Sequence, residues 1–344
     1  MSVGPNNERG TPGVLRVAVV GSGERLEAVL AAVRGTGQIE VVGQAGMAAG
    51  GGLPGLPWFD DPRALLAAPE VQAVLLAGST RRDAEHAQLA AERNLPLWRL
   101  PPAGRSFAES AEAAARVRKV AAVRRVASWW EHVFEHVWRE LAFPPDFRPL
   151  LSELRLSVRG PVQQSWRASV AEAGGGVLAT DGYGLLEALV AVRGLPESVV
   201  AAAGRLRAKS AARETEDTVV AVLRYTGGGC AVLRMAWDLP PGEQTLIHHG
   251  AAASVTLTGE VVTVADADGR TIDERPLPSE WLPSELVRFV QFVRGDARDQ
   301  AAAPLERHLA VSALLDALYL SARTGHPESP HKFYATTGWP EPRP

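Results

Sequence analysis

Cysteine is nearly absent from this chain, and that excludes an intrachain disulfide. Cys230 is the only one among 344 residues, and its apolar surroundings are typical of a small buried side chain. No apolar run approaches the roughly 20 residues that cross a bilayer, and the first residues lack the basic-then-apolar order of a secretory signal. We therefore expect a cytoplasmic protein without a membrane partner, in which residues 1–13 form a disordered leader.

Strong charge of one sign is also absent. The formal net charge is −3, which gives no case for a nucleic-acid partner. Lysine is rare as well, because it occurs only at Lys119, Lys209 and Lys332. Few positions could therefore hold a catalytic lysine.

The sequence pattern changes near Pro145. Before it, short buried strands such as 14–21 alternate with helical patterns, as in a doubly wound parallel sheet. After it, most segments alternate apolar and polar residues, as in strands covered on one face. We predict an α/β Rossmann-like, nucleotide-binding-type domain over 14–128, an α+β domain with a large, mostly antiparallel sheet over 129–326, and a Pro-rich tail over 327–344.

The stretch GGGVLATDGYGLLE, residues 174–187, resembles a signature of the glucose-fructose oxidoreductase / inositol dehydrogenase / MocA (Gfo/Idh/MocA) family, usually GGGxxxDxGxHxxD. VLRVAVVGSGE before it, and ETEDTVVAVLRYTGG and HHGAAASVTLTG after it, follow in the family's order over residues 14–326. The resemblance implies an NAD- or NADP-dependent oxidoreductase of a sugar or polyol. It also implies a homo-oligomer that forms through the C-terminal sheet.

The family's reactive side chains are missing from this frame. Thr180 stands at the position of its Asp and Gly184 at that of its His, and its catalytic lysine falls on Leu100 or Pro101. Gly46 occupies the place of the acid that reads the ribose. We therefore expect a divergent member without standard dehydrogenase activity, which binds a small sugar- or polyol-like ligand in the interdomain crevice or acts as a sensor or interaction subunit.

Two glycine turns remain as candidate cofactor contacts, because backbone N–H groups can face phosphates there. These contacts are Gly21, Ser22, Gly23, Gly78 and Ser79. A merely structural turn is the alternative, since Glu24 would oppose a phosphate. An active NAD(P)-dependent oxidoreductase with a rearranged site also stays open, as does non-redox chemistry such as elimination or isomerisation.

Aromatic and histidine side chains follow the last strand of the first domain. The predicted substrate-pocket residues are Trp129, Trp130, His132 and Tyr183. In an active enzyme the proton donor would be Tyr183, His132 or His136. The two histidines are four residues apart on one helix face and could share a metal, but the surrounding fold is not of that class, and we predict no metal site.

Further predictions concern the edge of the crevice. Residues 161–170, PVQQSWRASV, alternate as a strand does. Arg81 and Arg82 lie beside the crevice mouth as an anion site or as solvated arginines. Asp181 is expected to cap its helix or to face solvent, because one residue along a helix rotates a side chain by about 100°. His308 is expected on the surface.

Overall fold

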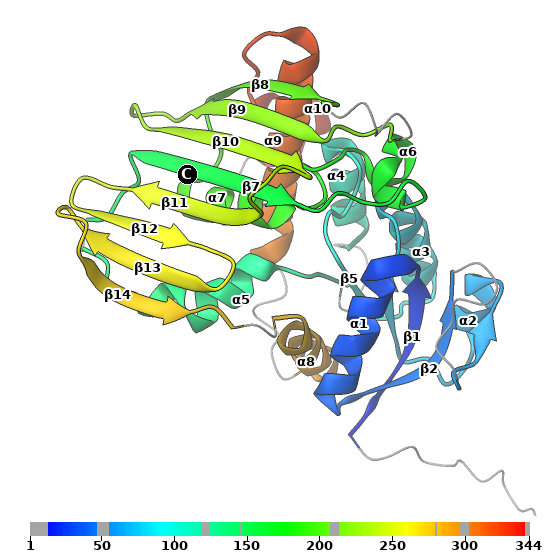
Figure 1. The fold of residues 1–344 in the computed structure, drawn as a ribbon. Coiled ribbons are helices and arrows are strands. Elements are labelled where there is room, and N and C mark those ends of the chain that lie inside the picture. The colour runs from blue at the N-terminus through cyan, green and yellow to red at the C-terminus, as the bar shows by residue number, and fades with distance from the viewer. Residues whose placement is uncertain are drawn as a thin grey trace, which may run out of the picture.

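The chain forms two sheets, one after the other, in the computed structural model (Figure 1). The structure describes residues 13–46, 55–117, 124–144, 146–206, 213–278, 281–295 and 303–340. The predicted leader lies outside these residues except for Gly13. Within the predicted tail, residues 331–337 form a helix, α10 (His331–Thr337).

The first sheet is parallel and has the strand order β3-β2-β1-β4-β5-β6. Its strands are β1 (Leu15–Gly21), β2 (Ile39–Ala45), β3 (Trp58–Phe59), β4 (Ala73–Ala77), β5 (Leu97–Arg99) and β6 (Arg124–Val126). Its helices are α1 (Gly23–Thr36), α2 (Pro62–Ala67), α3 (Thr80–Glu92) and α4 (Phe107–Val117). The central strands are buried on both faces, as their continuous apolar runs predicted.

The second sheet has the order β14-β13-β12-β11-β7-β10-β9-β8, and within it only β7 and β10 pair in parallel. Its strands are β7 (Leu151–Val158), β8 (Ser198–Gly204), β9 (Thr218–Arg224), β10 (Cys230–Trp237), β11 (Glu243–His249), β12 (Ala253–Leu257), β13 (Val261–Asp266) and β14 (Thr271–Pro276). Three helices pack on one face, namely α5 (Trp129–His136), α7 (Tyr183–Arg193) and α9 (Ala303–Thr324). The predicted fold class is confirmed.

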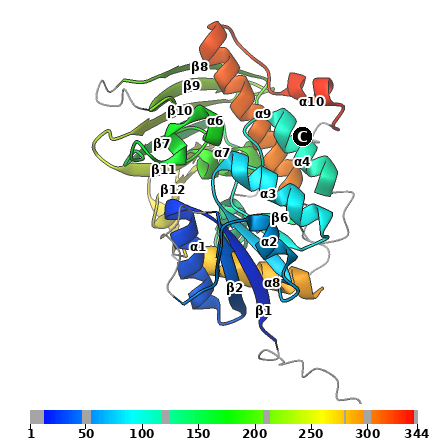
Figure 2. The ribbon, with the colours of Figure 1, turned by 90° about the vertical axis from the view of Figure 1, so that its right-hand side faces the viewer.

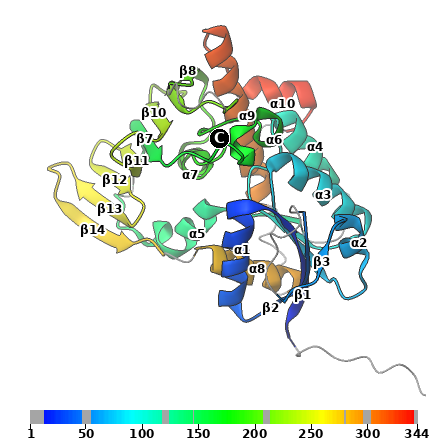
Figure 3. The same ribbon diagram turned by 45° about the vertical axis from the view of Figure 1, so that its right-hand side comes forward.

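Two C-terminal helices tie the halves together. α8 (Trp281–Arg294) follows the second sheet but packs against α1 and the first sheet through Leu286, Phe289 and Val290 (Figure 3). α9 lies beside both β8 and α4 (Figure 2). Both helices belong to the predicted second domain but contact the first, so their contacts cross the predicted domain boundary at 128/129. That boundary stays a prediction.

The predicted strand over 161–170 is wrong. The segment forms a 3-10 turn, η2 (Trp166–Ala168), and a short helix, α6 (Val170–Ala173). The Ser165 hydroxyl accepts from the N–H of Arg167, and the Glu214 carboxylate accepts from the N–H of Val170 at 3.2 Å. These local bonds compete with a sheet ladder, and alternation alone could not reveal them.

The glycine triplet of the family signature is a packing feature. A Cβ on Gly175 would lie 2.0 Å from the Tyr319 hydroxyl, and one on Gly176 would lie 1.9 Å from the Glu216 carbonyl oxygen. The Glu216 carboxylate accepts from the N–H groups of Gly176 and Leu178, at 2.7 and 3.2 Å. This explains how the motif persists although its reactive side chains are gone.

Candidate ligand site between the two sheets

The crevice begins where the order of the first sheet reverses, between β1 and β4. Gly21 and Ala77 pair at the carboxyl ends of these strands. A Cβ on Gly21 would lie 2.4 Å from the Ala77 carbonyl oxygen, so only glycine allows this approach. Ligands of open α/β sheets bind outside the carboxyl ends of the strands at such a reversal.

The first turn of α1 could receive a phosphate. Ser22 precedes the helix, and its side chain makes no cap bond. Gly23 has a φ of 65°, and a Cβ there would meet no atom within 4 Å. The first N–H groups of a helix have no partner within it and attract anions. The predicted contacts Ser22 and Gly23 therefore have suitable geometry.

The second turn is already engaged by protein groups. The N–H of Gly78 donates to Asp83 at 2.9 Å, and Ser79 caps α3 by accepting from the N–H of Arg82. The Ser79 hydroxyl also donates to Glu172 of α6 at 2.5 Å. Arg81 binds the same carboxylate at 2.6 Å. Ser79 and Arg81 therefore join the first sheet to the segment that covers it.

Arg25 fills the next part of the crevice. Its guanidinium donates to the carbonyl oxygens of Pro101 at 2.9 Å and Gly78 at 3.4 Å, across the ends of β4 and β5. The Trp166 ring lies 4.2 Å from it. Burial lowers the pKa of Arg25 to about 10, and the charge of Asp83 acts in the opposite direction. A cation thus stands beside the turn where the family carries its lysine.

Arg167 closes the crevice from the other side. It binds Glu24 of α1 at 2.8 Å and Asp181 at 2.7 Å. Trp237 donates to the same Asp181 carboxylate at 2.8 Å. The expectation that Asp181 caps the helix or faces solvent is therefore wrong, because η2 brings Arg167 against it. The neighbouring Thr180, which stands at the position of the family's Asp, donates from its hydroxyl to the Gly176 carbonyl oxygen at 2.8 Å.

The remaining predicted catalytic positions hold no reactive group toward the crevice. Gly184 faces Trp129, whose ring would lie 3.5 Å from a Cβ there. Leu100 packs against the core of the first sheet. Pro101 contributes its carbonyl oxygen to Arg25.

Most of the predicted pocket residues are core residues. Trp130 is buried and packs edge-on against Trp138, with ring centroids 5.0 Å apart. Tyr183 is buried with its hydroxyl 2.8 Å from Nδ1 of His308. His308 is itself fully buried, so its predicted surface position is wrong. Among these residues, Trp129 is partly exposed.

The two predicted proton donors lie on α5 and do not line the open part of the crevice. His132 is buried, and burial lowers its pKa to about 4. His136 is exposed, and its Nδ1 lies 2.9 Å from the carbonyl oxygen of His132. Within the described residues, no group of three or more His, Cys, Asp or Glu side chains could hold a metal ion.

The open part of the crevice, here called the crevice cavity, has a volume of about 640 Å³. It is lined by Ser22, Gly23, Glu24, Ser79, Arg82, Val162, Gln163, Gln164, Ser165, Trp166, Ala168, Ser169, Glu172 and Glu214. Hydroxyl, amide and carboxylate groups dominate, beside one indole ring. The residues between 162 and 172 were missed because the segment was predicted as a strand, and their serine and glutamine content was the only available signal.

Asp83 is buried beneath the crevice, between two arginines. Burial raises its pKa to about 6, although Arg99, Arg25 and the N–H of Gly78 favour its charged form. Arg99 donates to the carbonyl oxygens of Ala103 at 2.9 Å and Pro102 at 3.0 Å. Beneath the crevice, the carboxyl of Asp83 therefore interacts with the charges of Arg25 and Arg99.

Known proteins resemble this arrangement. The family model described as GFO/IDH/MocA C-terminal domain matches residues 148–256. The resemblance of the chain to the Gfo/Idh/MocA family is thereby confirmed. No curated protein sequence matches the chain.

Among the described residues, no helix is long and apolar enough to span a membrane.

Solved structures share the fold over nearly the whole chain. Levoglucosan dehydrogenase in complex with NADH and levoglucosan has a TM-score of 0.75 at 17% identity and covers 92% of this chain and 99% of its own. The WlbA dehydrogenase from Bordetella pertussis, in complex with NADH and UDP-GlcNAcA, has 0.75 at 18%, covering 93% and 99%. Aldose-aldose oxidoreductase from Caulobacter crescentus, complexed with glycerol, has 0.74 at 16%, covering 92% and 99%. At these identities the likeness shows the fold alone.

Proposed function

We propose that this protein binds a small sugar- or polyol-like ligand in the crevice cavity and lacks standard dehydrogenase activity. The observation that carries the proposal is the placement of Arg25 across the ends of β4 and β5, under Trp166. The absence of reactive side chains at Thr180 and Gly184 supports it. The ligand would occupy the crevice as substrate of another chemistry or as the signal of a sensor or interaction subunit.

The lining of the crevice cavity suits a polyhydroxyl ligand. Serine hydroxyls and the amides of Gln163 and Gln164 can both donate and accept hydrogen bonds. Trp166 can provide an apolar face for a sugar ring. Two of the three carboxylates are paired with arginines, since Arg81 binds Glu172 and Arg167 binds Glu24, and Glu214 accepts from the Val170 N–H. A neutral ligand therefore fits this lining better than a strongly charged one.

A complete dinucleotide does not fit these residues. The turn at Ser22 and Gly23 could hold its phosphates, but Gly46 has no side chain for the ribose. At the nicotinamide end of such a cofactor, Arg25 and Trp166 lie over the strand ends. They therefore occupy the space that the nicotinamide ring would take beside α7. We therefore derive no hydride step from this geometry.

An active NAD(P)-dependent oxidoreductase with a rearranged site is the second candidate. It is favoured by the first turn of α1, whose N–H groups have no side-chain cap. Asp181 would be its proton acceptor, because it lies beside Thr180 and next to Arg167. Turnover of a sugar or polyol with NAD or NADP would favour this candidate over the first.

Ligand binding can be tested without any cofactor. We expect saturable binding of a monosaccharide or polyol from a calorimetric panel, and Trp166→Ala should weaken it at least about tenfold through loss of the ring contact. Trp58→Ala is the matched control, because Trp58 lies on β3, does not line the crevice cavity and donates from its indole to Asp60 at 3.0 Å. Equal affinity in both variants would remove the crevice cavity as the binding site.

We also propose a homo-oligomer that forms through the open face of the second sheet. Val200 lies directly opposite Val222, and Val222 lies opposite Val232, so the three form a row across β8, β9 and β10. They are 47%, 49% and 37% exposed. Contiguous apolar rows on a sheet face commonly mark protein contacts.

A cytoplasmic location remains part of the proposal and is supported by the single cysteine.

A further inference from the structure

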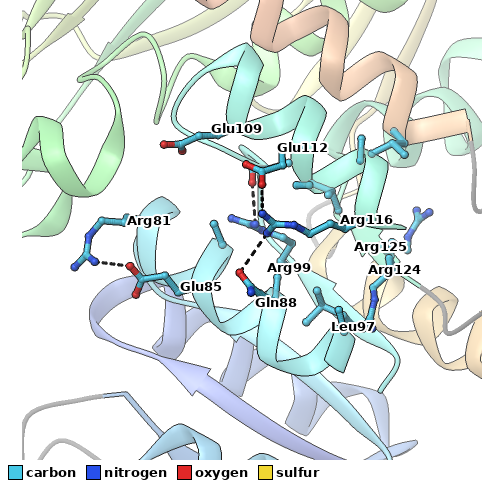
Figure 4. A pocket seen from close by; sticks show the side chains of 18 of the residues that line it. Arg81, Glu85, Gln88, Leu97, Arg99, Glu109, Glu112, Arg116, Arg124 and Arg125 are labelled. Atoms are coloured by element: carbon cyan, nitrogen blue, oxygen red, sulfur yellow. Dashed lines mark hydrogen bonds and ion pairs between the residues drawn. The ribbon is translucent and has the colours of Figure 1, made fainter. Parts of the chain in front are cut away.

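A second cavity lies between α3 and α4 (Figure 4). Its volume is about 260 Å³, and no residue lines both this α3–α4 cavity and the crevice cavity. The two helices face it through alanines, namely Ala84, Ala87 and Ala91 of α3 and Ala113 and Ala114 of α4. Methyl groups do not reach across, which leaves space above the sheet.

The sheet register places two arginines on the floor of this cavity. Leu97 pairs with Arg124 and Arg99 pairs with Val126 in the parallel ladder of β5 and β6. Paired residues, and residues two apart on a strand, point to the same face. Arg99 and Arg124 therefore face α3 and α4 together with Leu97 and Val126, and all four line the cavity.

Both arginines have unused binding capacity. Arg99 is 3% exposed, and its Nε has no hydrogen-bond partner among the described residues. Arg124 donates to the carbonyl oxygens of Leu95 and Ala90, and within the described part of the chain no carboxylate pairs with it. Burial lowers the pKa of Arg124 to about 10. A desolvated guanidinium without a counter-ion is unfavourable.

The carboxylates around the cavity do not supply that counter-ion. Glu85, Glu109 and Glu112 each bind an arginine four residues away in the sequence, namely Arg81, Arg105 and Arg116. Figure 4 shows Glu85 turned toward Arg81 and Glu112 toward Arg116. Among the described residues, these carboxylates therefore leave the charge of Arg124 without a counter-ion.

We propose that the α3–α4 cavity binds a small organic carboxylate. The carboxylate head would lie against Arg124 and the free N–H of Arg99, because a guanidinium matches a carboxylate in geometry and charge. The apolar body would lie on Leu97, Val126 and the alanines. The volume admits a compact body such as one aromatic ring, given about 30 Å³ per water. The site is independent of the function proposed for the crevice.

Calorimetric titration with benzoate tests this site. We expect saturable binding of benzoate, much weaker binding of its neutral isostere benzamide, and none of inorganic phosphate, which lacks an apolar body. Arg124→Gln should weaken benzoate binding at least about tenfold, whereas Arg124→Lys should retain part of it. Arg116→Gln is the control, because Arg116 is already paired with Glu112 at the rim.

Thermal unfolding of each variant separates loss of the site from loss of the fold. Ala87→Phe, which fills the cavity from α3, should abolish benzoate binding while the protein stays folded. The proposal is overturned if the wild type does not bind benzoate at millimolar concentration, if benzamide or phosphate binds equally well, or if folded Arg124→Gln binds as the wild type does.

Discussion

Arg25 belongs to the first turn of α1, and its guanidinium ends against the carbonyl oxygens of Gly78 and Pro101. Its neighbours Asp83 and Arg99 are buried. Arg25, Asp83 and Arg99 thus form a cluster of charged side chains, and the indole ring of Trp166 packs over Arg25. Because these charged groups interact with one another and with the backbone, the neutral hydroxyl and amide groups of the crevice cavity are the ones that can recognise a ligand.

The buried carboxyl of Asp83 predicts a pH effect on stability. Its pKa is raised to about 6 from 3.8, so the folded protein holds a proton that the unfolded chain releases between these values. The resulting penalty is absent below pH 4 and complete above about pH 6, on the order of 3 kcal/mol. Asp83→Asn should therefore gain stability relative to wild type as the pH rises from 4 to 7.

Chemical denaturation at several pH values measures this difference. Glu40→Gln, at an exposed position on β2, is the control and should show no such trend. A constant difference between wild type and Asp83→Asn across the range would contradict the raised pKa.

At the scale of elements, the glycines of the signature differ in their packing. Some lie in close contact with neighbouring backbone, whereas Gly184, at the position of the family's His, has room for a side-chain carbon. Gly176 lies against the Glu216 backbone, and Gly184 lies in ordinary contact distance of Trp129. Gly176→Ala should cost roughly 1–3 kcal/mol or more, because the added Cβ meets backbone that cannot turn away. Gly184→Ala should be neutral or slightly stabilising in α7. Urea unfolding of both variants checks this, and equal midpoints would refute it.

Sequence patterns predicted the elements that local periodicity determines. The buried strands, the order of the two sheets and the glycine frame at 174–187 follow from apolar runs and from the resemblance. The turn η2 and the helix α6 could not be predicted, because Ser165 bonds within the turn and the distant Glu214 bonds at the start of the helix, each through single hydrogen bonds. Nor could the contact of Arg25 with Trp166, which joins residues 141 positions apart after both sheets have formed.

At the scale of the whole molecule, the open valine row on the second sheet predicts self-association. Val222→Lys places a charge in the centre of the row and should shift the protein to monomers in light scattering. Phe134→Lys is the matched control, because Phe134 is 44% exposed on α5. An unchanged mass for Val222→Lys, or a monomeric wild type, would exclude this face as the interface.

Domain closure is the second property at this scale. Glu24, Arg25 and Ser79 of the first half contact Arg167, Trp166 and Glu172 of the second. These three contacts span the strand ends where a dinucleotide lies in Rossmann folds. The same closure leaves the crevice cavity open beside them.

Titration of NADH and NADPH into the wild type and Arg25→Ala tests the central claim most directly. We expect no saturable binding by the wild type at millimolar cofactor and a gain of binding when Arg25 is removed, read by calorimetry and by NADH fluorescence. Micromolar binding by the wild type, followed by reduction or oxidation of a sugar or polyol at ordinary enzyme rates, would contradict the proposal.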